Sequence, residues 1–181
     1  MRKPNTAEIS RGFSLIELMI AMAVLSVGLL GGIAVIAVSS ANNGRSKLHS
    51  TAIVLAQSTM EKIVAIPQRA TGEDAKTKLT DCAGNTFTID TAFRAGGGPE
   101  LIDSGAFAGT IDFSKPPVDN YAMRYFVCST GTSVGYDIRW RIDAGPTPAT
   151  QLVTVSAKPI VSAGASQLAL PYTLRQLRGD F

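Results

Sequence analysis

The chain has only one histidine, His49, and two cysteines, Cys82 and Cys128, among its 181 residues. A structural zinc site takes about four such ligands, so no metal site is predicted, and His49 is expected to pack or to face solvent. Charged residues are only 17% of the sequence, against roughly 25% in typical soluble domains. The formal net charge of +3 is small, so nucleic acid is not expected as a partner.

Motifs of catalytic and phosphate-binding sites are also missing. Gly96, Gly97 and Gly98 form a glycine run, but the helix and lysine that follow such a run in a phosphate-binding loop are absent. Asp137 and Asp143 are expected to be surface carboxylates on a strand and at its end. We therefore predict no catalytic residues, no cofactor and no enzymatic activity.

Charge and proline are absent from one long N-terminal segment. No charged residue occurs from Leu18 to Val38, and these 21 residues match the roughly 20 that cross a hydrocarbon core. No proline occurs between Phe13 and Ile66, and Pro67 ends the helical pattern. We predict one helix over residues 13–66, which would span roughly 80 Å at about 1.5 Å per residue.

A helix of that length must leave the membrane in its second half. Residues 39–47, "SSANNGRSK", contain poor helix formers followed by basic residues, and Gly44 would allow a bend. Beyond them, apolar residues at spacings of three and four predict a helix face that packs on a globular domain. This stripe consists of Leu48, Ala52, Leu55, Ala56, Met60 and Ile63.

A lone carboxylate, Glu17, stands near the start of the apolar segment, where the bilayer core penalises a charge by roughly 2.5–3.5 kcal/mol. A secretory signal peptide would be cut near residues 37–41, but the apolar run is longer than such a peptide needs. A plain membrane anchor explains the length, and the basic residues before it would hold the N-terminus in the cytoplasm. Neither interpretation explains Glu17.

Residues 11–20, "RGFSLIELMI", closely resemble the processing site of type IV pilins and of the pseudopilins of type II secretion. In that family a short basic leader ends in glycine, a prepilin peptidase in the membrane cuts after it, and the new N-terminal residue is methylated. The resemblance implies cleavage between Gly12 and Phe13 and N-methylation of Phe13. The family's filament-forming subunits often carry a proline in the apolar segment, which this chain lacks.

The resemblance also gives Glu17 a role as the fifth residue of the mature chain. Its carboxylate would pair with the Phe13 ammonium of a neighbouring subunit, because two paired charges in low dielectric cost less than two buried apart. The alternative is that Glu17 reaches the membrane interface, as side chains near helix ends do. Gly28 and Gly32 form a G-x-x-x-G, which would let assembling helices approach closely.

The remaining residues predict a small antiparallel sheet. Residues 68–81 are expected to be a polar connection, and residues 95–120 a loose, glycine-rich segment. Strand patterns occur at 86–93, 121–129, 136–143, 151–161 and, with Leu168, Leu170, Tyr172 and Leu174 alternating, near the C-terminus. Short loops between the last four of these imply a meander.

Within "YDIRWRID" (136–143), alternation places Trp140 toward the core and Arg139 and Arg141 on a wet face. These two arginines, Arg175 and Arg178 would contact phosphates only if they shared a face. Charges on a solvated strand are the simpler explanation.

We therefore predict an α+β, type IV pilin-like fold: a long N-terminal helix packed on an antiparallel sheet of about four strands. The expected parts are a cleaved leader (1–12), a transmembrane and assembly half of the helix (13–41), an amphipathic half (42–66) and a globular β domain (67–181). The resemblance is greatest to PilV-type minor pilins and to minor pseudopilin I of type II secretion, and it does not separate them.

The expected function is that of a minor pilin, an accessory structural subunit of a type IV pilus. Two alternatives stay open: a minor pseudopilin, and a membrane-anchored periplasmic binding domain that does not assemble. The expected partners are prepilin peptidase, other pilin subunits and the inner-membrane assembly machinery. The chain would cross the inner membrane once, with its C-terminal domain in the periplasm, before it enters a pilus fibre or pseudopilus. In that oxidising compartment Cys82 and Cys128 would form a disulfide, the alternative being two separate buried thiols.

Overall fold

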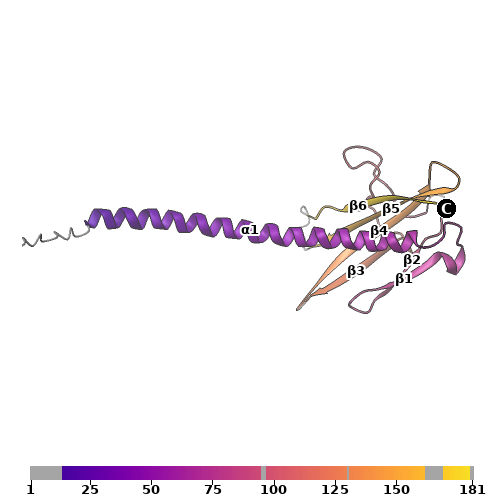
Figure 1. Cartoon of the computed structure of the whole chain (residues 1–181), viewed down its shortest axis with the longest axis horizontal. Coiled ribbons are helices and arrows are strands. Elements are labelled where there is room, and N and C mark those ends of the chain that lie inside the picture. The colour runs from indigo at the N-terminus through magenta and orange to yellow at the C-terminus, as the bar shows by residue number, and fades with distance from the viewer. Residues whose placement is uncertain (1–13, 95–96, 130, 162–168, 180–181) are drawn as a thin grey trace, which may run out of the picture. The chain divides into compact units, whose positions relative to one another are not determined.

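The computed structural model describes residues 14–94, 97–129, 131–161 and 169–179. Its elements in chain order are α1 (Leu15–Val64), a 3₁₀ helix (Gly72–Ala75), β1 (Lys76–Thr80), β2 (Thr86–Asp90), β3 (Ala122–Ser129), β4 (Thr132–Ala144), β5 (Thr150–Ile160) and β6 (Tyr172–Gly179) (Figure 1). The predicted α+β architecture of one long N-terminal helix and antiparallel sheets is confirmed. The chain forms two compact units, residues 1–45 and 46–181, and α1 passes from one into the other.

In the first unit, the part of α1 from Leu18 to Val38 carries no charge and is apolar on every side. All residues of α1 up to Arg45 are exposed, including large side chains such as Leu15 (77% exposed) and Leu18 (55%). The helix is long and apolar enough to cross a membrane, and its helical hydrogen bonding continues through Gly44. Side chains of this kind need lipid or other helices around them, because water would leave the whole apolar surface unburied.

In the second unit, the end of α1 packs on the sheet through the predicted stripe. Ala52, Ala56, Met60 and Ile63 are buried, while Leu48 and Leu55 are half-buried. They join a core made mainly by the inward residues of β4 and β5, which are Tyr136, Ile138, Trp140, Ile142, Val153, Val155 and Ala157. Figure 1 shows these last turns of the helix lying along the sheet.

The main sheet is the predicted meander, with strand order β3-β4-β5-β6 and every neighbouring pair antiparallel. Core residues face one another across it, as Trp140 does Val155 and Ile138 does Ala157. Pro159 is tolerated in a central strand because the pairing of β5 with β6 already ends at Ala157 and Tyr172.

Some strand limits differ from the predicted ones. β4 begins at Thr132, inside the segment expected to be a turn, because Gly131 at φ +78° is the left-handed residue and the chain after it already pairs with β3. β6 begins at Tyr172, and Leu170 just before it is exposed. Leu168 lies outside the described residues.

A second, two-stranded sheet was not predicted. Residues 68–81 were expected to be a polar connection, but they contain the 3₁₀ helix and β1, which pairs with β2 from Lys76–Asp90 to Thr80–Thr86. β1 has a single large apolar residue, Leu79, so its sequence lacks the alternation of a half-buried strand. Interactions of its turn with β3, described below, hold the hairpin.

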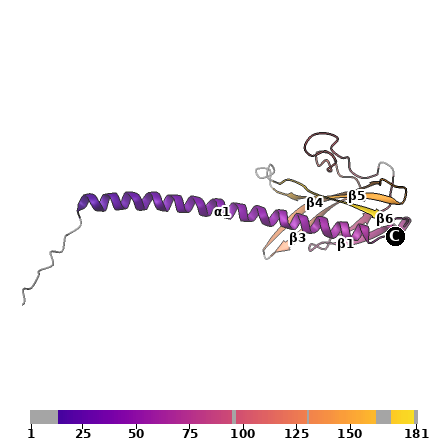
Figure 2. The same ribbon diagram turned by 45° about the horizontal axis from the view of Figure 1, so that its top comes forward.

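The alternation of the strands predicted that the outer face of the main sheet is exposed to solvent, but part of this face is covered. Residues 97–120 form a loop that covers it, and Figure 2 shows part of this loop on the side of the sheet away from α1. Arg139 is only 4% exposed, and its Nη1 donates to the carbonyls of Lys115 (2.7 Å) and Asp112 (3.4 Å). The expectation that Arg139 is solvated is therefore wrong, because loop carbonyls take the place of water around it.

Candidate functional site

The start of α1 is the region on which the sequence places the functional residues. Gly12 and Phe13, the expected cleavage and methylation positions, lie outside the described residues. The Ser14 carbonyl accepts the first helical hydrogen bonds, from the N–H groups of Glu17 (3.0 Å) and Leu18 (3.2 Å). Glu17 is therefore in the first turn of α1, where an anion is favoured by the helix dipole.

The surroundings of Glu17 are apolar, and its carboxylate has no partner within the described part of the chain. Leu15, Ile16, Leu18 and Met19 are its exposed neighbours. Once lipid or other helices cover this surface, an unpaired carboxylate there is costly. A cation from outside the described residues would offset that cost.

Gly28 and Gly32 lie on the exposed apolar part of the same helix. A Cβ atom built on either glycine meets no atom of the described residues within 4 Å, apart from its own stretch of helix. The described residues therefore leave this strip of helix open to an approaching neighbour, and nothing in the single chain tests whether one packs there.

Cys82 and Cys128 form a disulfide with a Cα–Cα distance of 5.8 Å, which ties the β1–β2 turn to the end of β3. Tyr125 strengthens the same junction, since its hydroxyl donates to the Thr80 carbonyl at 3.3 Å. The expected disulfide is thus present. It joins the β1–β2 hairpin, which was not predicted from the sequence, to the main sheet, which was.

Asp81 holds this junction together from within, and sequence reasoning missed it. Its carboxylate accepts hydrogen bonds from the backbone N–H groups of Ala83 (3.0 Å) and Asn85 (2.8 Å) and from the Asn85 side chain (2.9 Å). It also accepts a bond of 3.3 Å from the backbone N–H of Phe126 in β3. The segment "DCAGN" (81–85), an aspartate opening a glycine turn, is the signal that would have identified it.

These bonds change the acidity of Asp81. Burial alone would raise the pKa of its carboxyl group, but the hydrogen bonds from Asn85, Phe126 and Ala83 outweigh it and lower the pKa below the usual value. The folded junction therefore stabilises the ionised carboxylate of Asp81 over its protonated form.

Arg178 in β6 is buried, at 3% exposure, and its guanidinium is bonded within the fold. Its Nη1 donates to the Ile63 carbonyl at 3.0 Å and its Nη2 to the Thr91 carbonyl at 2.9 Å, while Gln151 Oε1 accepts from the same guanidinium. Ile63 lies at the end of α1, whose last carbonyls lack helical partners and favour a cation. Arg178 therefore caps the helix.

The other candidate residues make contacts within the folded domain. Asp137 pairs with Arg139 (2.8 Å), and Asp143 pairs with Arg141 (2.7 Å). The indole N–H of Trp140, which is buried, donates to the Asp90 carbonyl at 2.9 Å. His49 is half-buried on α1. Among the described residues, no group of three His, Cys, Asp or Glu side chains is placed to hold a metal ion.

Comparison with known proteins bears on the N-terminus. A family model described as the prokaryotic N-terminal methylation motif matches residues 9–33. No curated protein and no solved structure matches the chain. The motif supports a pilin-like or pseudopilin role, and so a structural subunit that is anchored in the membrane, processed by prepilin peptidase and assembled with other pilin subunits.

The matched motif contains Glu17 and runs into the apolar helix, and this helix continues into the core of the globular unit. Together with the antiparallel sheets and the disulfide, this is a pilin-like arrangement of elements. The chain therefore carries the N-terminal signal of the type IV pilin and pseudopilin superfamily.

Proposed function

We propose that this protein is a minor pilin, an accessory structural subunit of a type IV pilus. The single observation that carries the proposal is the methylation motif at residues 9–33, joined without interruption to an apolar helix. The leader (1–12) is removed after Gly12, and the new terminus at Phe13 is methylated. The chain then crosses the inner membrane once, with its globular domain in the periplasm.

Assembly proceeds through the first half of the helix, residues 13–41, whose side chains up to the end of that range are exposed where described. The Phe13 ammonium of one subunit pairs with Glu17 of the next, which sets the axial register. Gly28 and Gly32 let neighbouring helices approach. Residues 42–66 hold the globular part, residues 67–181, on the fibre. The absence of a partner for Glu17 among the described residues supports a pairing between chains.

The second candidate is a minor pseudopilin of a type II secretion system, since the same motif marks both classes. The test is a deletion of the gene followed by two assays in the same strain: recovery of surface fibres by shearing, and secretion of folded exoproteins. Loss of fibres, with the protein present in the wild-type fibre fraction, supports the minor pilin. Loss of secretion with normal fibres supports the pseudopilin.

The third candidate is a membrane-anchored periplasmic binding domain that never assembles. It predicts that the protein stays in the membrane fraction, with residues 1–12 still attached and with no cross-links to other pilin subunits. A photo-cross-linker placed at Val24, on the exposed apolar helix, distinguishes this case. Cross-links to other subunits support assembly, and cross-links to lipid alone support the anchor.

A further inference from the structure

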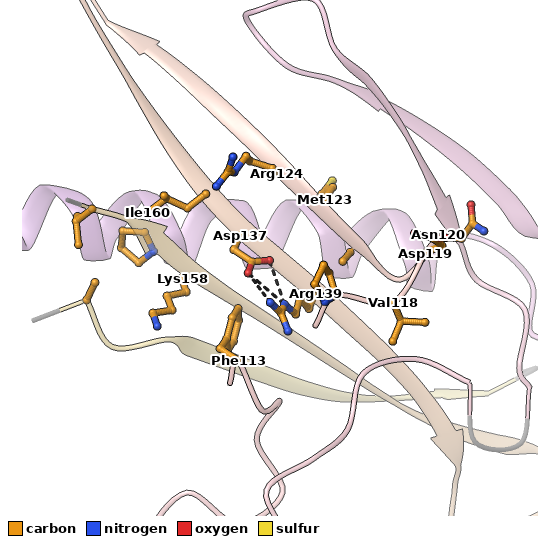
Figure 3. Close-up of a pocket in the computed structure, with 15 residues that line it drawn as sticks. Phe113, Val118, Asp119, Asn120, Met123, Arg124, Asp137, Arg139, Lys158 and Ile160 are labelled. Carbon is orange, nitrogen blue, oxygen red and sulfur yellow. Dashed lines mark hydrogen bonds and ion pairs between the residues drawn. The ribbon is translucent and has the colours of Figure 1, made fainter. Parts of the chain in front are cut away.

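The outer face of the main sheet contains a groove that assembly through α1 does not use. It has a volume of about 570 Å³, within the range of small-molecule sites. Outward residues of β3, β4 and β5 form its floor, and the loop that ends at Asn120 forms one wall (Figure 3). These floor residues alternate with core residues such as Ile138, so the groove lies on the face of the sheet opposite the core.

Three charged residues cross the floor in one row. Arg124 pairs in register with Asp137, and Asp137 pairs with Lys158. Figure 3 shows Asp137 between the two cations. Neighbouring strands lie about 4.8 Å apart, so the Cα atoms of Arg124 and Lys158 are separated by about 10 Å.

The central anion of this row is already neutralised. Both oxygens of Asp137 accept from Arg139, with Nε at 3.1 and 3.2 Å and Nη2 at 2.8 Å. The Arg139 guanidinium is in turn fixed by the Lys115 carbonyl, so the pair is part of the rigid floor. A bidentate pair of this kind leaves little charge for a third group.

The two outer cations are not neutralised. Within the described part of the chain Arg124 has no ion pair or hydrogen bond, and it is exposed. Lys158 Nζ faces the ring of Phe113, 5.8 Å from its centroid, and no carboxylate pairs with it among the described residues. The groove therefore presents two positive charges, one at each side of a neutral floor, and one carboxylate, Asp119, in its wall.

The lining of the groove is partly apolar, through Pro117, Val118, Ile160 and Val161. The exposed carboxylate of Asp119 and the amide of Asn120 follow Val118 in the same wall. Val118 is 38% exposed, and Phe113 contributes an aromatic ring beside Lys158. The apolar part of a ligand can fill the space between such walls, and anionic groups at the two ends of the ligand can contact Arg124 and Lys158.

We propose that this groove binds a small organic dicarboxylate with a flat apolar body. One carboxylate contacts Arg124, the other contacts Lys158, and the body lies over Asp137, beside the Phe113 ring that packs on the Arg139 guanidinium. Binding of this kind needs no contribution from α1, so it is independent of processing and assembly.

The test is isothermal titration of the full-length protein in detergent micelles with three aromatic probes. Terephthalate carries two carboxylates, benzoate carries one, and terephthalamide carries none. Terephthalate is expected to bind tightest, benzoate about tenfold more weakly, and terephthalamide without measurable heat. Raising the salt concentration weakens terephthalate binding, because the cations are partly exposed.

Three single variants assign the site. Arg124→Gln and Lys158→Gln each weaken terephthalate binding about tenfold, while Arg175→Gln, an exposed cation of the same sheet outside the groove, leaves it unchanged. Near-ultraviolet circular dichroism checks that each variant is folded. The proposal is overturned if wild-type protein gives no heat with terephthalate, if terephthalamide binds equally well, or if Arg175→Gln weakens binding as much as the groove variants.

Discussion

The guanidinium of Arg178, in the last strand, donates a hydrogen bond of 3.0 Å to the main-chain carbonyl of Ile63, in the last turn of α1. The two residues are 115 positions apart in the sequence, so this bond joins the end of the helix to the end of the chain. The sheet thereby supplies a hydrogen-bond donor to the last turn of the helix.

Replacing Arg178 by methionine should destabilise the globular unit by about 3 kcal/mol. The Thr91 carbonyl and Gln151 Oε1 would each lose a buried donor, and the Ile63 carbonyl would keep only the 3.4 Å bond from the Ile66 N–H. Urea unfolding followed by the fluorescence of Trp140, the single tryptophan, measures this loss. The control is Arg124→Met, at an exposed position of β3 without an ion pair or hydrogen bond among the described residues, which should change stability by less than about 0.5 kcal/mol. Equal effects of the two variants would contradict the capping role of Arg178.

Removing the disulfide should cost about 4 kcal/mol in the chain-entropy model, since Cys82 and Cys128 are separated by 46 positions. The double variant Cys82→Ser, Cys128→Ser is compared with wild-type protein in urea, each with and without reductant. Reductant should lower the stability of the wild type to that of the variant and leave the variant unchanged. A wild type that is indifferent to reductant would show that the bridge adds nothing to folding.

Acid should weaken the junction at Asp81. The folded-state pKa of this carboxyl lies below its unfolded value, so the stabilisation is complete above the unfolded pKa and is lost as the pH falls through the folded one. With an unfolded pKa of about 3.9, the loss begins near pH 4 and continues below it.

Asp81→Asn removes this titration and is the direct comparison. The variant should be less stable than the wild type at pH 7, and the difference in melting temperature between the two should shrink between pH 4 and pH 2. Asp112 and Glu73 also have lowered pKa values and contribute equally to both proteins. A difference that stays constant over this pH range would rule out a charge-dependent role for Asp81.

Much of the fold could be predicted from periodicity. The helix stripe from Ala52 to Ile63 and the alternation around Trp140 each follow from local spacing, and both reached the core as expected. These patterns succeed because burial of one face is a property of each element by itself.

Long-range interactions explain what could not be predicted. β1 is polar and short, and it is held by the disulfide of Cys82 and by the bond between Asp81 and the Phe126 N–H, which no local pattern encodes. Arg139 and Arg178 looked like surface charges because their acceptors are backbone carbonyls of distant segments. Every residue has a backbone carbonyl, so the sequence does not indicate which carbonyls will lie close to an arginine in the fold.

At the N-terminus, Glu17 could be identified from the sequence because it is a single carboxylate next to a long apolar segment. Glu17→Ala should still be processed, because the peptidase is expected to recognise Gly12, but its incorporation into fibres should fall about 100-fold or more. The reason is that the Phe13 ammonium of the neighbour would be buried without a counter-charge, at a cost of about 3 kcal/mol or more. Quantitative immunoblotting of sheared fibres against the membrane fraction measures this ratio.

Glu17→Asp is the matched control, since it keeps the charge on a shorter side chain and should retain part of the incorporation. Incorporation of Glu17→Ala at the wild-type level would remove the charge pair from the mechanism of assembly.

The most direct measurement is intact-mass and N-terminal peptide mass spectrometry of the protein purified from membranes of its own host. We expect a mature chain that begins at N-methylated Phe13, and a Gly12→Leu variant that keeps residues 1–12. A wild-type chain that keeps its leader, or one that begins elsewhere, for instance after Ala41, would contradict the assignment of this protein as a processed fibre subunit.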